Sequence, residues 1–359
     1  MASSLGRCVF TVSVLVLAGV ARARTPEYRV QILPVPDNCE AYSVWHALTQ
    51  NVEATGILYC DSWTETKAVV WRGNTLSELA TLGGPSAVPY GIGKNGAILG
   101  SAETPDMYDS EYHVQRPTLW TDGTVRDLST LGGPLGAAAA GNASGLIVGA
   151  SQVADDDPQL GRKPMRATVW DGGSILDIGD LGGPESAAYD VNDRGWIVGS
   201  STTRIPLGPG FEEHAFLYDG QVMNDLGTLG GGASLAWAIN SAGDVVGYSY
   251  TGERHVCHAF LWRKGSLTDL GTLGGPLSWA FDMNDRGDIV GWSRLSNSRD
   301  HAVLWRAGKL IDLQDASDVP QDCVLQKATA INNRGEVLAD AQCSHRARVA
   351  ILSPTRSQD

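Results

Sequence analysis

The chain has 359 residues, 43 of them glycine, with 19% charged residues and a formal net charge of -13. A surface this acidic repels phosphate backbones and anionic lipid headgroups, which disfavours nucleic acids and membrane surfaces as partners. Charged residues are spread evenly and no low-complexity tract is present, so the sequence is not that of a disordered chain.

Residues 1–23 have the pattern of an export signal. Arg7 precedes an apolar run over residues 9–20, and an Ala-Arg-Ala sequence ends at Ala23. The apolar run is shorter than the roughly 20 residues that a membrane-spanning helix needs, and no second such run follows. We therefore expect one mature domain over residues 24–359, secreted or periplasmic and without a membrane span. Its net charge is -15, because Arg7 and Arg22 leave with the signal.

The mature chain repeats one unit of roughly 43 to 50 residues, which indicates a stacked or closed array of one supersecondary unit. Each unit contains four short runs rich in aliphatic, β-branched and aromatic residues, typical of strands. An N-x-x-G turn such as residues 240–243 separates the first two runs, because Asn starts tight turns and Gly adopts the positive φ they require. In the fifth unit the runs are residues 234–240, 244–249, 258–262 and 267–271.

Four antiparallel strands per unit of this length are typical of a propeller blade. The sequence predicts an all-β fold, a seven-bladed β-propeller. An additional strand over residues 28–35 is expected to pair with residues 348–353, which completes the last blade and removes two exposed sheet edges. The predicted blades are residues 36–81, 82–130, 131–180, 181–229, 230–272, 273–315 and 316–354 together with 28–35.

The cysteines predict two disulfides. Cys39 and Cys60 bracket the first two strands of the first unit, and Cys323 and Cys343 bracket those of the last. Antiparallel pairing brings the members of each pair side by side, and export permits their oxidation. Each bridge closes a loop of about 20 residues, a stabilisation of about 3 kcal/mol. Cys257 is left over and is expected to be a free thiol, with an intermolecular bridge as the alternative.

A basic residue opens the third strand of every unit, and an acidic residue lies in the fourth strand of six units. The hairpin register brings the two close together, so we interpret them as structural cross-strand pairs rather than as a catalytic ring. The basic residues are Lys67, Arg116, Arg166, His214, His258, His301 and Arg346, and the acidic ones are Glu78, Asp127, Asp177, Asp225, Asp269 and Asp312.

The sequence lacks the linear motifs of common catalytic, nucleotide-binding and metal sites. The LGGP segments lack a following GK[ST], so they are interpreted as turns between blades rather than phosphate-binding loops. Residues 155–157 are three consecutive aspartates without the alternating spacing of a calcium loop, and a solvated loop is the favoured interpretation. No catalytic triad or metal motif is present, so we expect no catalytic residue, metal or cofactor, although residues gathered from several blades could still form an active site.

The repeats differ most between their second and third strands, where residues 102–115, 151–165 and 202–213 form long loops. Loops on a rigid scaffold are where binding residues accumulate. We expect these neighbouring loops to bind an extracellular protein or glycan, and the alternative of tolerated surface insertions carries equal weight. The candidate binding residues are Tyr108, Asp109, Glu111, Tyr112, Arg162, Lys163 and Phe211.

Residues 214–218 and 258–262 read His-Ala-Phe-Leu-Tyr and His-Ala-Phe-Leu-Trp, near DLGTLGG, INSAG and DVVG segments. In these motifs the chain resembles the bacterial "HAF" extracellular repeat family. The resemblance covers essentially all of the mature chain, is strongest over residues 174–308, and implies export and a repeated β structure, but no activity. The first and last units depart from it, with Lys67-Ala-Val-Val-Trp and Arg346-Ala-Arg-Val-Ala in place of the HAF segment.

These features favour an exported, monomeric binding module over an enzyme. The competing hypothesis is a hydrolase or lyase that acts on extracellular polysaccharide, with carboxylates gathered from several blades. Two or three buried acidic residues with raised pKa near the axial opening would favour the enzyme. An opening lined by Gly, Ala and Ser would favour the binding module.

Overall fold

The structure is a computed structural model and describes residues 26–60, 62–207 and 210–355. The predicted signal lies outside these residues. In this part of the chain the fold is all-β, with one short helix, α1 (Leu313–Ala316). No helix here is long and apolar enough to cross a bilayer.

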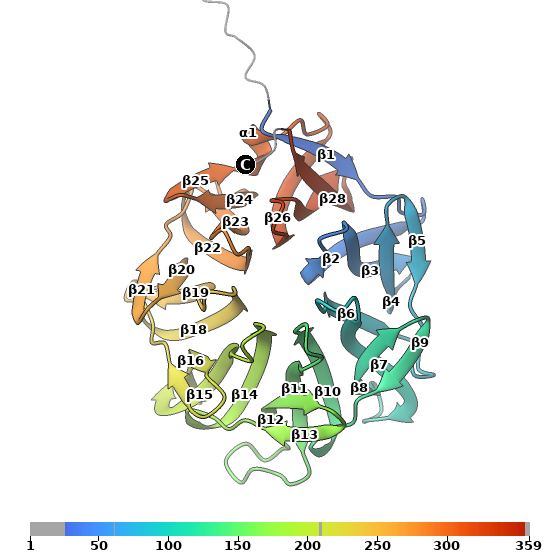
Figure 1. Ribbon diagram of the computed structural model, residues 1–359, viewed down its shortest axis with the longest axis vertical. Helices are drawn as coiled ribbons and strands as arrows, with labels where there is room; N and C mark the ends of the chain where they lie inside the picture. The colour runs from blue at the N-terminus through green and yellow to red at the C-terminus, as the bar shows by residue number, and fades with distance from the viewer. Residues whose placement is uncertain (1–25, 61, 208–209, 356–359) are drawn as a thin grey trace, which may run out of the picture.

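The strands form antiparallel meanders arranged around a common axis, the arrangement of a β-propeller (Figure 1). The first strands, nearest the axis, are β2 (Cys39–Leu48), β6 (Ala87–Ile92), β10 (Gly132–Gly141), β14 (Gly182–Val191), β18 (Gly230–Ile239), β22 (Gly274–Met283) and β26 (Cys323–Ile331). The second strands are β3 (Glu53–Cys60), β7 (Ile98–Met107), β11 (Ile147–Val153), β15 (Ile197–Leu207), β19 (Val245–Thr251), β23 (Ile289–Leu295) and β27 (Val337–Cys343).

The outer strands follow in the same order. The third strands are β4 (Ser62–Arg72), β8 (His113–Thr121), β12 (Met165–Asp171), β16 (Gly210–Tyr218), β20 (Cys257–Arg263), β24 (Asp300–Arg306) and β28 (Arg346–Pro354). The fourth strands are β5 (Thr75–Glu78), β9 (Thr124–Asp127), β13 (Ser174–Asp177), β17 (Met223–Asp225), β21 (Ser266–Asp269) and β25 (Lys309–Asp312). Single parallel pairs, Glu213 with Ala233 and Cys257 with Leu277, join the meanders from β14 to β25 into one larger sheet.

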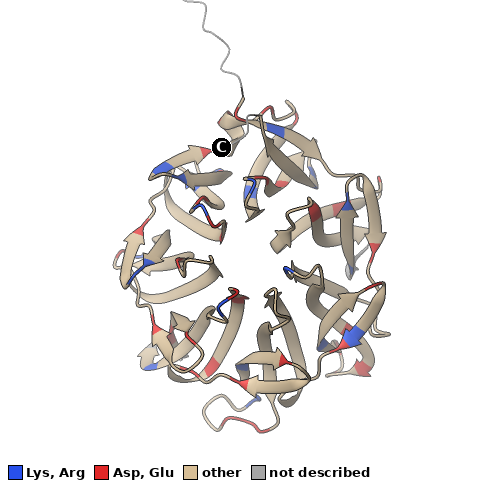
Figure 2. Cartoon of the chain, in the orientation of Figure 1, with Lys and Arg blue, Asp and Glu red and all other residues tan. Residues whose placement is uncertain are grey.

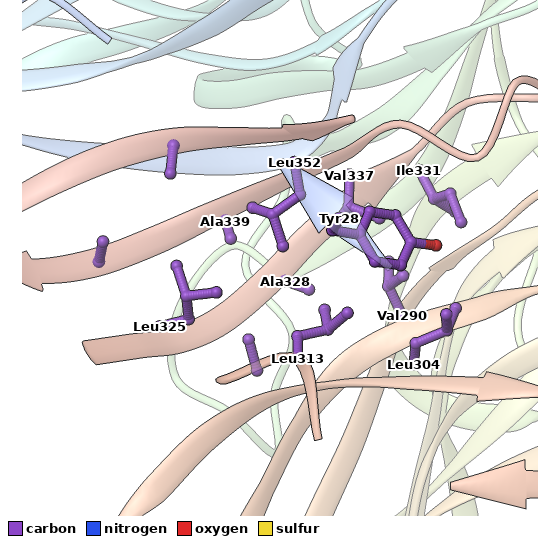
Figure 3. Close-up of a cluster of buried hydrophobic side chains, with 13 residues drawn as sticks. Tyr28, Val290, Leu304, Leu313, Leu325, Ala328, Ile331, Val337, Ala339 and Leu352 are labelled. Atoms are coloured by element: carbon purple, nitrogen blue, oxygen red, sulfur yellow. The ribbon is translucent and has the colours of Figure 1, made fainter. Parts of the chain in front are cut away.

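The last meander takes its fourth strand from the N-terminal end of the described chain. β1 (Tyr28–Ile32) runs antiparallel to β28, with Tyr28 opposite Pro354 and Ile32 opposite Ala350. The predicted pairing of these segments is confirmed, with a strand three residues shorter than the predicted 28–35. Tyr28 is fully buried among Leu304, Leu313 and Leu352 (Figure 3), and its hydroxyl accepts a hydrogen bond from Arg306.

Repeated polar side chains join one meander to the next. Ser234 Oγ accepts a hydrogen bond from the Ala215 amide of the preceding meander at 2.9 Å and donates to the Gly227 carbonyl at 2.6 Å. Asn192 Nδ2, in an N-x-x-G turn, donates to the Asn240 carbonyl of the next turn at 3.1 Å. The same contacts recur at Ser186, Ser278, Asn142 and Asn284. Asn332 of the last meander donates likewise to the Thr49 carbonyl of the first.

The glycine that ends each DVVG or IVG segment allows the first two strands to approach closely. A Cβ atom on Gly247 would overlap the Leu235 carbonyl oxygen, and equivalent overlaps occur at Gly199 and Gly291. β18 bulges between Ala236 and Ala238 beside this glycine. Close backbone packing therefore explains the glycine of the motif without a catalytic or binding role.

All six predicted cross-strand pairs are present. His301 Nδ1 lies 2.7 Å from Asp312, and Arg166 Nε lies 3.0 Å from Asp177. Figure 2 shows acidic and basic positions spread over the strands and turns around the whole molecule. The remaining four pairs are Lys67–Glu78, Arg116–Asp127, His214–Asp225 and His258–Asp269.

Both predicted disulfides, Cys39–Cys60 and Cys323–Cys343, are confirmed. Cys257 is free and buried at the first position of β20, in agreement with the expected free thiol at a strand end. Burial raises the pKa of this thiol to about 12, so Cys257 remains protonated at neutral pH.

Replacing Tyr28 by Ala tests how much the β1–β28 pairing stabilises the fold. The substitution removes a fully buried ring and a hydroxyl that binds Arg306, so the free energy of unfolding should fall by about 3–5 kcal/mol. Urea denaturation followed by tryptophan fluorescence measures this change. Arg29→Ala, an exposed position of the same strand, is the control, and equal effects of the two substitutions would contradict the prediction.

Candidate functional site

Cross-strand pairs from the first and second strands flank the axis. Residues opposite each other in an antiparallel pair project from the same face of the sheet. In three successive meanders both side chains of the pair are small, and in the following meanders at least one of them is bulky or charged. The pairs are Val88–Ser101, Ala137–Ala150 and Ala187–Ser200, and then Leu235–Tyr248, Trp279–Trp292, Lys327–Asp340 and Tyr42–Ile57.

The bulky pairs contribute to a cavity of about 660 Å³, which we call the aromatic cavity. It is defined by five rings, Tyr42, Tyr59, Tyr90, Trp279 and Phe281, with Lys327, Thr329 and Asp340 as polar neighbours. The Trp279 and Phe281 rings meet edge to face at 6.1 Å, and Tyr248 stacks on Trp279 at 4.4 Å. Tyr42 and Tyr59 form a further edge contact at 6.0 Å. The walls are therefore preorganised by ring packing.

A second cavity of about 330 Å³ adjoins the first and shares Tyr90 with it. Tyr189 and Trp237 line it together with several small residues, and we call it the alanine cavity. The small residues are Ala137, Ala139, Gly149, Ala150, Ala187 and Ala188.

Asp340 is the carboxylate of the aromatic cavity. Its Oδ1 accepts hydrogen bonds from the amide and the hydroxyl of Ser43, both at 2.7 Å, which links β27 to β2. The Ser43 hydroxyl also lies 2.7 Å from Thr329 Oγ1. Burial raises the pKa of Asp340 to about 6, opposed by the Ser43 hydrogen bonds and by Lys327.

His46 reaches across the axis from β2. The strand is irregular between Ser43 and Leu48, and His46 has a φ of 50°, so its side chain leaves the regular strand direction. His46 Nε2 lies 2.9 Å from the Trp237 carbonyl, and Nδ1 lies 3.7 Å from Asp282. Burial by itself lowers the pKa of His46, but Asp190 and Asp282 outweigh it and the pKa rises to about 9.

A third cavity of about 630 Å³ lies among the N-x-x-G turns and is polar. His46 lines both this cavity and the alanine cavity, so its side chain separates the two. Asp190 and Asp282 also line the polar cavity. Each of their carboxylates accepts an amide hydrogen bond from the next first strand, at Ile239 and Ile331, both at 2.8 Å. These carboxylates thus connect neighbouring meanders.

The enzyme hypothesis predicted buried acidic residues with raised pKa, and the structure has two. Burial raises the pKa of both Asp340 and Asp190. They line different cavities, however, and Asp340 is the single carboxylate among the described residues that line the aromatic cavity. Glycoside hydrolysis usually needs two carboxyl groups facing one sugar. The aromatic cavity therefore lacks the carboxyl pair of that mechanism among its described residues, whereas the polar cavity holds Asp190 and Asp282.

Local hydrogen bonds stabilise two of the loops that the sequence suggested. Tyr108 and Tyr112 are 44% and 64% exposed at the tip of the β7–β8 hairpin, where Asp109 Oδ1 accepts the amides of Glu111 and Tyr112. In the next long loop, Asp157 Oδ1 accepts the amides of Gln159 and Leu160, as in an ordinary turn.

The other candidates have local partners. Arg162 binds both carboxylate oxygens of Glu185 at 2.8 and 2.9 Å, and Lys163 lies 3.6 Å from Asp156. Phe211 is half-buried opposite Pro206. Over residues 102–115, 151–165 and 202–213, as far as the structure describes them, no hydrogen bond or ion pair joins one of the three loops to another.

Sequence reasoning missed the aromatic cavity. The available signal was the departure of Trp279 and Lys327 from Ala137 and Ala187, which occupy the same position in the third and fourth units. In a repeat protein, such departures mark positions that the scaffold itself does not require.

Comparisons with known proteins give a fold likeness only. No family model matches the chain, and no curated protein matches it. The chain is similar to the β-propeller domain of the Trilobed protease from Pyrococcus furiosus, with a TM-score of 0.49 and 11% identity over 82% of this chain and 99% of that one. It is also similar to an acylaminoacyl peptidase from Pyrococcus horikoshii, with a TM-score of 0.45 and 11% identity over 88% of this chain and 58% of that one.

His46→Gln tests the buried charge at the axis. Glutamine retains a donor for the Trp237 carbonyl but has no charge. Because the pKa of His46 is raised from 6.5 to about 9, its stabilisation is complete below pH 6.5 and is lost as the pH rises through 9. We expect the variant to lose about 3 kcal/mol of unfolding free energy at pH 6 and little at pH 10. Urea denaturation at both pH values measures this difference, and an equal loss at both would contradict it.

Proposed function

We propose that the protein is an exported saccharide-binding module built as a seven-bladed β-propeller, in which β1 completes the last blade. The aromatic cavity is the observation that supports this function. Sugar rings present apolar C–H faces and a rim of hydroxyls, and they bind where aromatic faces lie beside a few hydrogen-bonding groups. Trp279, Phe281 and Tyr42 supply the faces, and Asp340 and Thr329 supply the polar groups.

The position of the cavity agrees with this proposal. Tyr59 lies near the end of β3, on the side of the molecule from which the connections between second and third strands emerge. A ligand would enter from that side, because His46 separates the alanine cavity from the polar cavity beyond it. The long loops could then contact the parts of a larger glycan that extend outside.

Export and relationship to the HAF repeats are part of the same proposal. The signal-like residues 1–23 support export, and the two disulfides fit an oxidising compartment.

The exposed rings of Tyr108 and Tyr112 support a second candidate function, a protein-binding surface on the β7–β8 hairpin.

Trp279→Leu separates the two candidates. The substitution keeps apolar volume but removes the flat ring, so we expect the affinity for a saccharide found by glycan array to fall about tenfold, which corresponds to about 1.4 kcal/mol. Isothermal titration calorimetry measures the affinity, and thermal melting checks the fold.

Tyr112→Ala is the matched control, because this ring is exposed and distant in sequence from the cavity. We expect its saccharide affinity to equal that of the unmodified protein. A loss confined to Tyr112→Ala would assign binding to the loops instead. Release of shorter sugars during incubation would establish the hydrolase or lyase.

A further inference from the structure

Lys327 and Asp340 depart from the pattern of the repeat. The residue five positions before the turn asparagine is Ala137, Ala187, Leu235 or Trp279 in the preceding units, and Lys327 occupies that place before Asn332. Its cross-strand partner is Asp340, where other meanders have Ala150, Ser200, Tyr248 or Trp292. The scaffold accepts uncharged residues at both places. Asp340 binds Ser43 of β2, so the charge of Lys327 is the one that the fold does not explain.

Lys327 presents its charge to the aromatic cavity. It is exposed and is the one cation among the described residues that line the cavity. The Asp340 carboxylate opposite binds the amide and hydroxyl of Ser43 and forms no ion pair with Lys327 within 4.0 Å. The ammonium group therefore retains hydrogen-bond donors for a ligand.

We propose that the aromatic cavity binds an acidic saccharide, a uronate, whose carboxylate is bound by Lys327. The inference rests on the proposed saccharide-binding function and adds the ligand class. Trp279 and Phe281 would pack against the apolar face of the sugar, and Lys327 would pair with the carboxylate at its rim.

The net charge of the protein limits how this selectivity arises. At -13, the whole chain repels an approaching anion. Preference for an acidic sugar must therefore come from the short contact with Lys327 and not from long-range attraction. Removal of this single charge should then abolish the preference.

Calorimetry with matched sugars tests the inference. The probes are trigalacturonate and trimannuronate, each beside its neutral counterpart, galactotriose and mannotriose. We expect one acidic sugar to bind at least about tenfold more tightly than its neutral counterpart, and Lys327→Met to remove about tenfold of that affinity while changing neutral binding less than about twofold. Lys327→Arg should retain the preference. Lys309→Met, on the outer strand β25, should leave both affinities unchanged.

Asp340→Asn is a gain-of-affinity test. At pH 7.5 the Asp340 carboxylate is charged and opposes an anionic ligand near Lys327, whereas Asn can still accept the Ser43 hydrogen bonds. We expect the ratio of acidic-sugar to neutral-sugar affinity to rise about threefold or more, because any change in hydrogen bonding to sugar hydroxyls affects both sugars alike. An unchanged ratio would contradict the assignment of the carboxylate to this site.

The two proposals fail in distinguishable ways. Equal affinity for acidic and neutral sugars, or equal losses of both in a folded Lys327→Met, would overturn the uronate inference and leave saccharide binding intact. Absence of binding to any saccharide on the array would overturn the proposed function together with the inference. Thermal melting of each variant ensures that only folded proteins are compared.

Discussion

The burial of sheet faces is the constraint on which this structure depends. A four-stranded meander has two apolar faces, and a single sheet would leave both in water. Val290, Ala302 and Leu304 of β23 and β24 are covered by Leu325, Ala328 and Ala339 of the next sheet, within one cluster of buried residues. Each sheet thus supplies half of its neighbour's core. The serine and asparagine hydrogen bonds between meanders, such as Ser234–Ala215 and Asn192–Asn240, fix the distance at which this packing occurs.

The surroundings of the axis are asymmetric because some residues differ from those at the equivalent positions of the other units. The third and fourth first strands, β10 and β14, approach the axis with Ala137 and Ala187, whereas other first strands carry larger or charged residues there. His46, Trp279 and Lys327 are departures, and together they divide and line the axial cavities. Their surroundings come from several units: His46 of the first meander contacts Trp237 and Asp282 from distant ones. A site of this kind is created by the ring arrangement itself.

Sequence reasoning succeeded where contacts are local. The Cys39–Cys60 bridge and the His301–Asp312 pair follow from the register of one hairpin, so spacing alone predicts them. The β1–β28 pairing followed from counting strands. The aromatic cavity could not be derived in this way, because Tyr42, Trp279 and Asp340 meet only after the units are placed around the axis. The irregularity of β2 that turns His46 inward has no signature in the repeat pattern.

The pairing of β1 with β28 has a kinetic consequence. The Arg348 side chain and the Cys39 carbonyl that bind across the junction of the first and last meanders are 309 residues apart in sequence. Loop-closure entropy opposes such contacts until the intervening sheets have formed, and folds dominated by distant pairings form slowly. β1 can therefore pair with β28 only after the chain between them has been synthesised. We expect this pairing to be a late step of folding.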